Sequence, residues 1–245
     1  MTNGQEPLTA TVDGVDLTFP VVVRDASIAT VTVLGSARGA RQALAGTGLE
    51  AVSPLPGRAL WTVSAIDYRD NDLGDYLEIA IAVVVRRKGR SRFGSAVDLA
   101  RARLHTHITH LPVNQRFTCL AGQQLWGFPK TMDQLSFDRV DVRLQATWSR
   151  DDQLIMRLVT PAVGRRPIPS TSLQTYTVMD DRTHVTEFTM GGSEGRFGSG
   201  VSVEIELGDH PVADELRRAG LPGRPMSAIW IGEASGSFGP PEPVD

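Results

Sequence analysis

The 245-residue sequence predicts a mainly β protein of the α+β class. Short runs rich in valine, threonine and isoleucine recur along the chain and are separated by glycine, aspartate and proline, a pattern typical of strands and turns. Apolar residues repeat at helical spacing in few places, at residues 36–45, 114–125 and 211–219. Because no internal repeat or linker divides the chain, we expect residues 1–245 to form one domain.

The composition argues against several classes of protein. A hydrophobic content of 41% is ordinary for a globular domain, and a net charge of −3 gives no general attraction to nucleic acid or to an anionic membrane. Cys119 is the only cysteine, so an intrachain disulfide is excluded. No stretch approaches the roughly 18 apolar residues of a membrane span, and the first residues lack the features of a signal peptide. We therefore expect a soluble, cytoplasmic protein.

The N-terminal half is expected to contain strands around one short helix. Ser36 precedes a weak apolar stripe that stops at Gly46, so Ser36 is predicted to cap this helix. Breaks at Asp-Gly and Asp-Ala-Ser separate the first three strands. The strands are predicted at Leu8–Val12, Leu17–Val23, Ile28–Leu34, Leu60–Ile66 and Tyr76–Val85.

The C-terminal half is predicted to begin with a helix and to continue mainly as strands. Asn114 is placed to cap a helix that Gly127 and Pro129 end. A glycine-rich segment, residues 191–200, precedes a strand instead of a helix, so we interpret it as a flexible hairpin connection and not as a phosphate-binding loop. Residues 1–7 and 236–245 are expected to be flexible. The remaining elements are a helix from Pro211 to Gly220 and strands at Leu135–Trp148, Leu154–Val159, Leu173–Val178, Val201–Leu207 and Met226–Ile231.

Two polar clusters suggest no site of their own. The first is basic, lacks interleaved aromatics, and is interpreted as a solvated hairpin tip or a subunit contact; it comprises Arg86, Arg87, Lys88, Arg90 and Arg92. In the second, His105 and His107 share one face of a strand at a spacing seen in metal sites. Because no clear carboxylate or fourth ligand follows, we expect ordinary strand histidines and no metal.

Lys130 is the candidate nucleophile. The stretch Gly122–Thr131 reads Gly-Gln-Gln-Leu-Trp-Gly-Phe-Pro-Lys-Thr and places Lys130 behind Trp126 and Phe128. Burial beside apolar rings disfavours an ammonium group, and a neutral amine attacks carbonyl carbon. The C-terminal end of the preceding helix favours the ammonium, so desolvation or a neighbouring charge would have to outweigh it. The alternative is a lysine whose stem packs on the rings while its head stays in water.

Glu78 is the second candidate site residue. It follows Tyr76 by two residues in a predicted strand, so the two side chains share a face and could point into the interior. A glutamate that points inward needs a partner or a function. The alternative is a glutamate that faces solvent at the strand end.

Several stretches of the chain resemble the acetoacetate decarboxylase superfamily. Its hallmark is an aromatic-Pro-Lys sequence at the end of a helix, which Phe128–Lys130 matches, and Leu73–Glu78 matches a Leu-Gly-x-Tyr-x-Glu stretch. Phe19–Arg24 and the C-terminal helix and strand also fall where the family has them. The resemblance implies a central closed antiparallel β-barrel or cone with a few flanking helices, assembled as a homo-oligomer.

The resemblance also implies an activity. Lys130 would be the Schiff-base lysine and Glu78 the acidic residue of an active site that takes a small oxo acid without a cofactor or a metal. The substrate-binding residues are expected to be Tyr76, Trp126 and Phe128, with Arg116 as a nearby candidate for the substrate carboxylate.

The chain departs from the family pattern in its supplementary polar residues. Thr131 stands where decarboxylases carry a second lysine, Asp16 falls in place of an arginine, Thr62 replaces an acidic residue, and Gln123-Gln124 replaces Arg-Glu. Three activities therefore remain open. They are decarboxylation of a β-keto acid, aldolase-dehydratase chemistry on an α-keto acid such as pyruvate, and non-catalytic binding of a small ligand on the same fold.

Overall fold

The computed structural model describes residues 8–88, 105–199 and 202–244. The helices are α1 (Ala37–Ala43), α3 (Arg116–Trp126) and α4 (Pro211–Ala219). The strands in the first half are β1 (Thr9–Val12), β2 (Val15–Thr18), β3 (Val21–Ser36), β4 (Leu49–Ala51), β5 (Arg58–Asn71), β6 (Tyr76–Arg87) and β7 (His105–Val113). Those in the second half are β8 (Lys130–Met132), β9 (Gln134–Val140), β10 (Arg143–Arg150), β11 (Gln153–Pro161), β12 (Arg166–Met179), β13 (Arg182–Ser199), β14 (Glu204–Leu207) and β15 (Arg224–Pro243).

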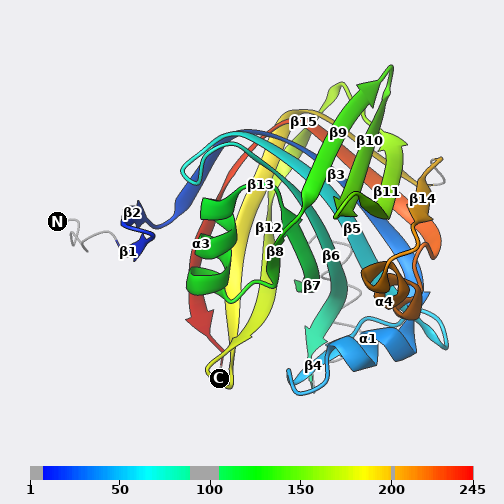
Figure 1. Ribbon diagram of the computed structural model, residues 1–245, viewed down its shortest axis with the longest axis horizontal. Coiled ribbons are helices and arrows are strands. Elements are labelled where there is room, and N and C mark those ends of the chain that lie inside the picture. The colour runs from blue at the N-terminus through cyan, green and yellow to red at the C-terminus, as the bar shows by residue number, and fades with distance from the viewer. Residues whose placement is uncertain (1–7, 89–104, 200–201, 245) are drawn as a thin grey trace.

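A large curled sheet dominates the molecule (Figure 1). Its strand order is β4-β6-β5-β3-β15-β13-β12-β7-β8, and an additional pairing of β6 with β7 closes a ring of hydrogen-bonded strands. Most neighbouring strands are antiparallel, including β6 and β7. The exceptions are the pairs of β7 with β12 and with β8, which are parallel. The expected mainly β fold with a closed central sheet and few helices is thus confirmed.

The parallel pair of β7 and β8 explains the position of α3. Parallel neighbours need a crossover connection, and α3 is that connection. The crossover brings the chain back beside β7 at Lys130, whose register partner is Leu111. In Figure 1, α3 lies near the C-terminal end of β15, well apart from α1 and α4.

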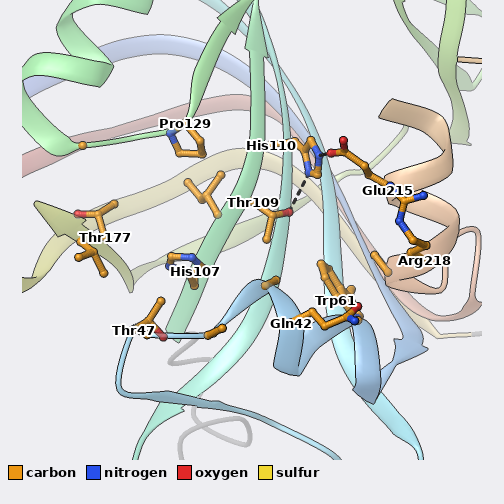
Figure 2. Close-up of a pocket in the computed structure, with 18 residues that line it drawn as sticks. Gln42, Thr47, Trp61, His107, Thr109, His110, Pro129, Thr177, Glu215 and Arg218 are labelled. Carbon is orange, nitrogen blue, oxygen red and sulfur yellow. Dashed lines mark hydrogen bonds and ion pairs between the residues drawn. The ribbon is translucent and has the colours of Figure 1, made fainter. Parts of the chain in front are cut away.

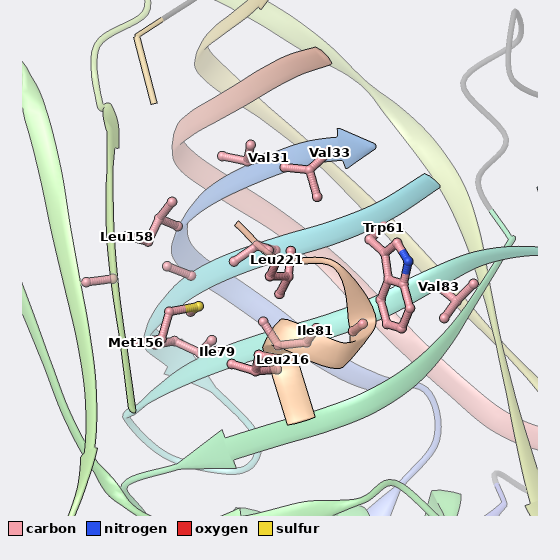
Figure 3. Close-up of a cluster of buried hydrophobic side chains, with 14 of the residues drawn as sticks. Val31, Val33, Trp61, Ile79, Ile81, Val83, Met156, Leu158, Leu216 and Leu221 are labelled. Atoms are coloured by element: carbon pink, nitrogen blue, oxygen red, sulfur yellow. The ribbon is translucent and has the colours of Figure 1, made fainter. Parts of the chain in front are cut away.

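A smaller sheet and α4 cover the outer face of the ring. This sheet has the order β14-β11-β10-β9, and its apolar residues pack with those of β3, β5 and β6 in one core. Figure 3 shows Leu216 of α4 close to Ile79 and Ile81 of β6 within that core. Because strand residues alternate between faces, Glu78 points away from this core and toward the inner face of the ring.

One predicted break between strands is absent, and one break was not predicted. We expected a break at Asp25-Ala26-Ser27, but β3 runs through it and accommodates the polar residues by shifts of register against β5. We also expected one strand over Leu135–Trp148, which is instead the hairpin of β9 and β10. Its turn contains Asp141 at φ 56, a conformation that aspartate tolerates better than most residues.

The C-terminal part contains more strand than predicted. The glycine-rich segment is not a flexible connection, because residues up to Ser199 belong to β13 and pair with β15. The tail from Gly236 does not fray either, since β15 continues to Pro243. Of the basic cluster, Arg90 and Arg92 lie outside the described residues, while Arg86 pairs with Glu50. No helix in the described part of the chain has the length and apolarity needed to span a membrane.

Candidate active site around Lys130 and Glu78

The two ends of α3 are fixed by local interactions. Gln115 caps the helix, because its side-chain oxygen accepts a hydrogen bond from the backbone N–H of Thr118 at 2.6 Å. The predicted cap, Asn114, is wrong; its side chain accepts from the backbone N–H of Leu77 instead. The predicted stop is confirmed, since Gly127 ends the helix in the left-handed region at φ 64. A Cβ at Gly127 would also lie 2.4 Å from Met179 Cγ, so glycine is required there.

Lys130 is buried and paired with Glu78. The Lys130 side chain is 5% exposed and the Glu78 side chain 8%, and Nζ lies 2.8 Å from Glu78 Oε2. Nζ also donates a hydrogen bond to Thr118 Oγ1 at 2.8 Å and lies 4.9 Å from the centroid of the Tyr76 ring. The lysine head therefore does not reach solvent, and Glu78 does not face solvent at the strand end.

Two residues of α3 that the sequence did not single out shape this site. Thr118 and Gly122 are four residues apart, so they lie on the same face of the helix, toward Lys130. The aliphatic stem of Lys130 runs so close to Gly122 that an added Cβ would lie 2.5 Å from Lys130 Cδ. The threonine-to-glycine spacing is the signal that could have indicated a helix face turned toward a polar group.

Tyr68 and Tyr76 form the wall beside the ion pair. They are register partners on β5 and β6, and their rings stack with centroids 4.4 Å apart. Burial raises the pKa of both phenols well above the usual range, and the negative charge of Glu78 raises the pKa of each further. Both phenols are therefore neutral near pH 7 and can donate hydrogen bonds.

Trp126 and Phe128 pack the end of α3 against the large sheet. The Trp126 indole N–H donates to the carbonyl oxygen of Gly239 at 2.9 Å, and its ring contacts Phe19 edge to face. Phe128 lies 6.0 Å from Phe188, measured between ring centroids. These contacts fix the segment that precedes Lys130, whereas the aromatic ring over Nζ belongs to Tyr76.

Arg116 lies apart from the ion pair. Its side chain is 74% exposed and pairs with Asp13 at 3.2 Å. Arg116 precedes Thr118 by two residues, and a helix turns about 100° per residue, so the two side chains point in nearly opposite directions. The structure does not bring Arg116 together with Lys130, and its role in carboxylate binding stays a prediction.

Of the positions that depart from the family pattern, Gln123 contacts Lys130, because its side-chain N–H donates to the Lys130 carbonyl oxygen at 2.7 Å, while Thr131, Thr62 and Asp16 have other partners or surroundings. The hydroxyl of Thr131 donates to Asp133 at 2.8 Å, and Asp133 in turn pairs with Arg150. Thr62 is buried on the same face of β5 as Tyr68. Asp16 is exposed on β2 and accepts a hydrogen bond from Thr11.

The histidines of β7 lie on the opposite face of the ring. His107 Nδ1 lies 3.0 Å from the carbonyl oxygen of Tyr176, and His110 pairs with Glu215. Among residues 8–88, 105–199 and 202–244, no three His, Cys, Asp or Glu side chains are grouped to hold a metal ion. The chemistry that this arrangement offers is proton exchange within one buried amine–carboxylate pair.

Replacing Gly122 by alanine should destabilise the protein through Lys130. Alanine in place of glycine normally stabilises a helix by about 1 kcal/mol. Here the new methyl group must displace the Lys130 stem, so we expect urea unfolding to show a net loss of about 1–3 kcal/mol. Gln124→Ala, on the exposed side of α3, is the control and should change stability by less than about 0.5 kcal/mol. In a Lys130→Ala background Gly122→Ala should no longer destabilise; an unchanged penalty there would contradict the proposed contact.

The buried phenols predict a loss of stability at alkaline pH. Their pKa is raised in the folded state, so the stability they contribute is complete below the unfolded-state pKa of about 10 and decreases as the pH rises above it. Absorbance at 295 nm should show tyrosine ionisation delayed beyond pH 10 in the native protein and not in urea. Tyr68→Phe and Tyr76→Phe should each remove part of the delayed signal. Ionisation of all tyrosines near pH 10, with the circular dichroism still native, would overturn this expectation.

Comparison with known proteins identifies the family and the fold of the chain. Residues 7–236 match the family model described as acetoacetate decarboxylase (ADC). No curated protein matches the chain. Among solved structures, the acetoacetate decarboxylase of Legionella pneumophila is similar at TM-score 0.65 and 14% identity, over 92% of this chain and 87% of that one.

Two ADC-like proteins have the same fold. The enduracididine biosynthesis enzyme MppR, complexed with pyruvate, is similar at TM-score 0.64 and 15% identity, over 98% of this chain and 99% of that one. An acetoacetate decarboxylase-like enzyme from Sphingomonas wittichii RW1 is similar at TM-score 0.56 and 16% identity, over 92% and 93% of the two chains. At these identities the structural matches establish the fold alone. The family model spans nearly the whole sequence, and the protein therefore belongs to the acetoacetate decarboxylase family of lyases.

Proposed function

We propose that this protein is a lysine Schiff-base lyase that acts on a small oxo acid. The observation that supports the proposal is the buried pair of Lys130 and Glu78, whose charged atoms lie 2.8 Å apart. A buried ion pair is rarely more stabilising than apolar residues of similar size, so stability alone does not account for it. A buried amine that can pass its proton to a neighbouring carboxylate has the properties of a nucleophile for ketones.

The first step would form the Schiff base. Proton transfer from Lys130 Nζ to Glu78 leaves a neutral amine, whose lone pair attacks the carbonyl carbon of the substrate. The carbonyl electrons move to oxygen, and a proton shift from nitrogen to oxygen gives a carbinolamine. Glu78 then returns its proton to the hydroxyl group, which leaves as water, and a positively charged iminium remains beside the Glu78 carboxylate. Thr118, which accepts a hydrogen bond from Nζ, would hold the amine in place.

The iminium can serve two reactions. In a β-keto acid, the bond to the carboxylate breaks, its electrons move toward the iminium nitrogen, and carbon dioxide leaves an enamine. In an α-keto acid, Glu78 removes a proton from the carbon next to the iminium, and the resulting enamine adds to an aldehyde before water is lost. Tyr76, whose ring lies over Nζ, is proposed to contact the substrate in either case.

Two observations support the second reaction as an alternative. Thr131 stands at the position of the second lysine of decarboxylases, and its hydroxyl donates a hydrogen bond to Asp133. MppR, which has this fold over 98% of the chain, was solved with pyruvate. We therefore propose pyruvate-type α-keto acids as the second candidate substrate class, after β-keto acids. Non-catalytic binding of a small ligand is the remaining alternative.

Three further properties follow from the family resemblance and are proposed with the activity. The protein would assemble as a homo-oligomer, act in the cytoplasm and need no cofactor. Trp126 and Phe128 are proposed to serve the substrate site by holding the segment that presents Lys130, since both rings pack between α3 and the large sheet.

Schiff-base formation can be tested cleanly because Lys88 and Lys130 are the only lysines of the sequence. We expect pyruvate or acetoacetate, followed by borohydride reduction, to add one substrate-derived group to the wild type, detected by intact mass and mapped by peptide digestion. Lys88→Arg should retain the adduct and Lys130→Ala should lose it. The adduct mass separates the reactions, because only a decarboxylated substrate lacks the carboxyl group. The proposal would be refuted if no keto acid gave an adduct on the wild type, or if Lys130→Ala gave an equal adduct.

The role of Glu78 needs a separate measurement. Glu78→Gln keeps the shape of the side chain but cannot exchange a proton. For a keto acid that the trapping experiment has identified as a substrate, turnover without borohydride should therefore fall by about 10²-fold or more. Glu206→Gln, on the exposed side of β14, is the matched control and should turn over at the wild-type rate. Wild-type turnover by Glu78→Gln would show that another group moves the proton.

A further inference from the structure

The inner face of the ring carries a pair of hydroxyl side chains that the proposed mechanism does not use. Thr30 of β3 and Ser64 of β5 are register partners, and their hydroxyl oxygens lie 2.9 Å apart. Strand residues alternate between the two faces of a sheet. The neighbours of Thr30 along β3, Ala29 and Val31, belong to the core outside the ring (Figure 3), as do both neighbours of Ser64 along β5. The two hydroxyls therefore point into the ring.

Strand register places this hydroxyl pair beside Glu78. Ser64 is the register partner of Ala80, which follows Glu78 by two residues on the inner face of β6. Diagonal neighbours on adjacent antiparallel strands lie about 7–8 Å apart, so Ser64 is close to Glu78 and Thr30 is one strand further away. A substrate bonded to Lys130 Nζ can therefore reach the pair with a short carbon chain.

The inner face is accessible on the side of the hydroxyl pair. Glu78 is buried, whereas Ala80, Ser64 and Thr30 are partly exposed. The backbone of these strands is paired within the sheet, and the core covers its outer face. The exposure of Ala80, Ser64 and Thr30 therefore belongs to side chains that face the interior. Because Ala80 is small, it leaves room for a substrate to pass over β6 toward the hydroxyls.

The surroundings of the pair are uncharged and mostly apolar. Ile28 and Ile66 are register partners on the same face and lie between the hydroxyls and the buried tyrosines. The charge of Glu78 is already balanced by Lys130 at 2.8 Å. Two hydroxyls that are bonded to each other use one donor, so one O–H group and several lone pairs remain for a ligand. This surface fits a neutral hydroxyl group on a short apolar chain.

The cavity outside β7 is separate from this inner surface. Figure 2 shows His107 and His110 directed into that cavity, with Glu215 of α4 beside His110. The register partners of the two histidines, Val83 and Ile81, belong to the outer core. The wall of the ring thus lies between the histidines and the ion pair, and the substrate chain meets the hydroxyl pair instead.

We propose that Thr30 and Ser64 select oxo acids that carry a hydroxyl group on the chain beyond the carbonyl. Selection of this kind requires the proposed Schiff-base function, because Lys130 fixes one end of the substrate. The free O–H of the pair donates to the oxygen of the substrate hydroxyl, and the substrate hydroxyl donates to a remaining lone pair. Thr30 and Ser64 then determine specificity and take no part in the bond changes at Nζ.

The test compares two keto acids of nearly equal shape. One is 4-hydroxy-2-oxopentanoate, which carries a hydroxyl group where the other, 4-methyl-2-oxopentanoate, carries a methyl group. With cyanoborohydride present, we expect the wild type to form the reduced adduct of the hydroxy acid about tenfold faster or more, measured by intact mass at equal, low concentrations. The double variant Thr30→Val Ser64→Ala should lower this ratio at least fivefold by slowing the hydroxy acid. Thr30→Val alone should lower it in the same direction.

The matched control removes a second threonine–serine pair. Thr189 and Ser237 are register partners on β13 and β15, and their hydroxyl oxygens also lie 2.9 Å apart. They lie on the face opposite to Phe188 and Phe238, which pack in the cluster on the inner face. Thr189→Val Ser237→Ala should therefore keep the wild-type ratio. Thermal unfolding of each variant checks that a lost adduct does not reflect lost structure.

The outcomes separate the selection from the Schiff base itself. Equal rates for the two acids would overturn the selection and leave the Schiff base in place. The same holds if the ratio is unchanged in Thr30→Val Ser64→Ala, if the control lowers it equally, or if pyruvate or acetoacetate gives an adduct and neither probe does. No adduct with any of these keto acids would refute the Schiff base, and the selection with it.

Discussion

The pairing of β6 with β7 is the constraint on which the site depends. It closes the ring, and it also places the strand that carries Glu78 beside the strand that β8 follows in parallel. Glu78 is the register partner of Val113, and Lys130 that of Leu111, so strand register alone brings the two charged residues to neighbouring positions. The helical crossover then supplies Thr118 on the remaining side. Three elements from different parts of the chain meet at one amine because the sheet closes there.

The surroundings of the ion pair are polar at short range and apolar beyond. Nζ has a carboxylate, a hydroxyl and an aromatic face within reach, and the stacked tyrosines and the end of α3 exclude solvent. In such a setting each charge is stabilised by the opposite charge of its partner, because solvent cannot replace a lost partner. The same setting makes a shared proton the simplest way to remove both charges at once. The geometry therefore makes Lys130 and Glu78 each other's charged partner in a site closed to solvent.

Local signals allowed much of the fold to be predicted, and long-range pairing explains what was missed. The Ser36 cap, the Gly127 stop and the inward direction of Glu78 depend on neighbours in the sequence, and all three are confirmed. The strand character of the glycine-rich segment depends on its pairing with β15, which lies far along the chain and leaves no local pattern. Thr118 was missed for a related reason: its spacing to Gly122 could indicate the helix face, but only the crossover brings its partner Lys130 beside that face.

The C-terminal strand has a consequence for how the chain can fold. The 20 residues of β15 lie between β3, near the start of the chain, and β13. During synthesis, the edges of β3 and β13 cannot be joined until β15 has left the ribosome, so the ring closes only after β15 has been made. Unpaired strand edges are prone to aggregate. Until β15 pairs with both, a nascent chain of this protein therefore exposes the edges of β3 and β13.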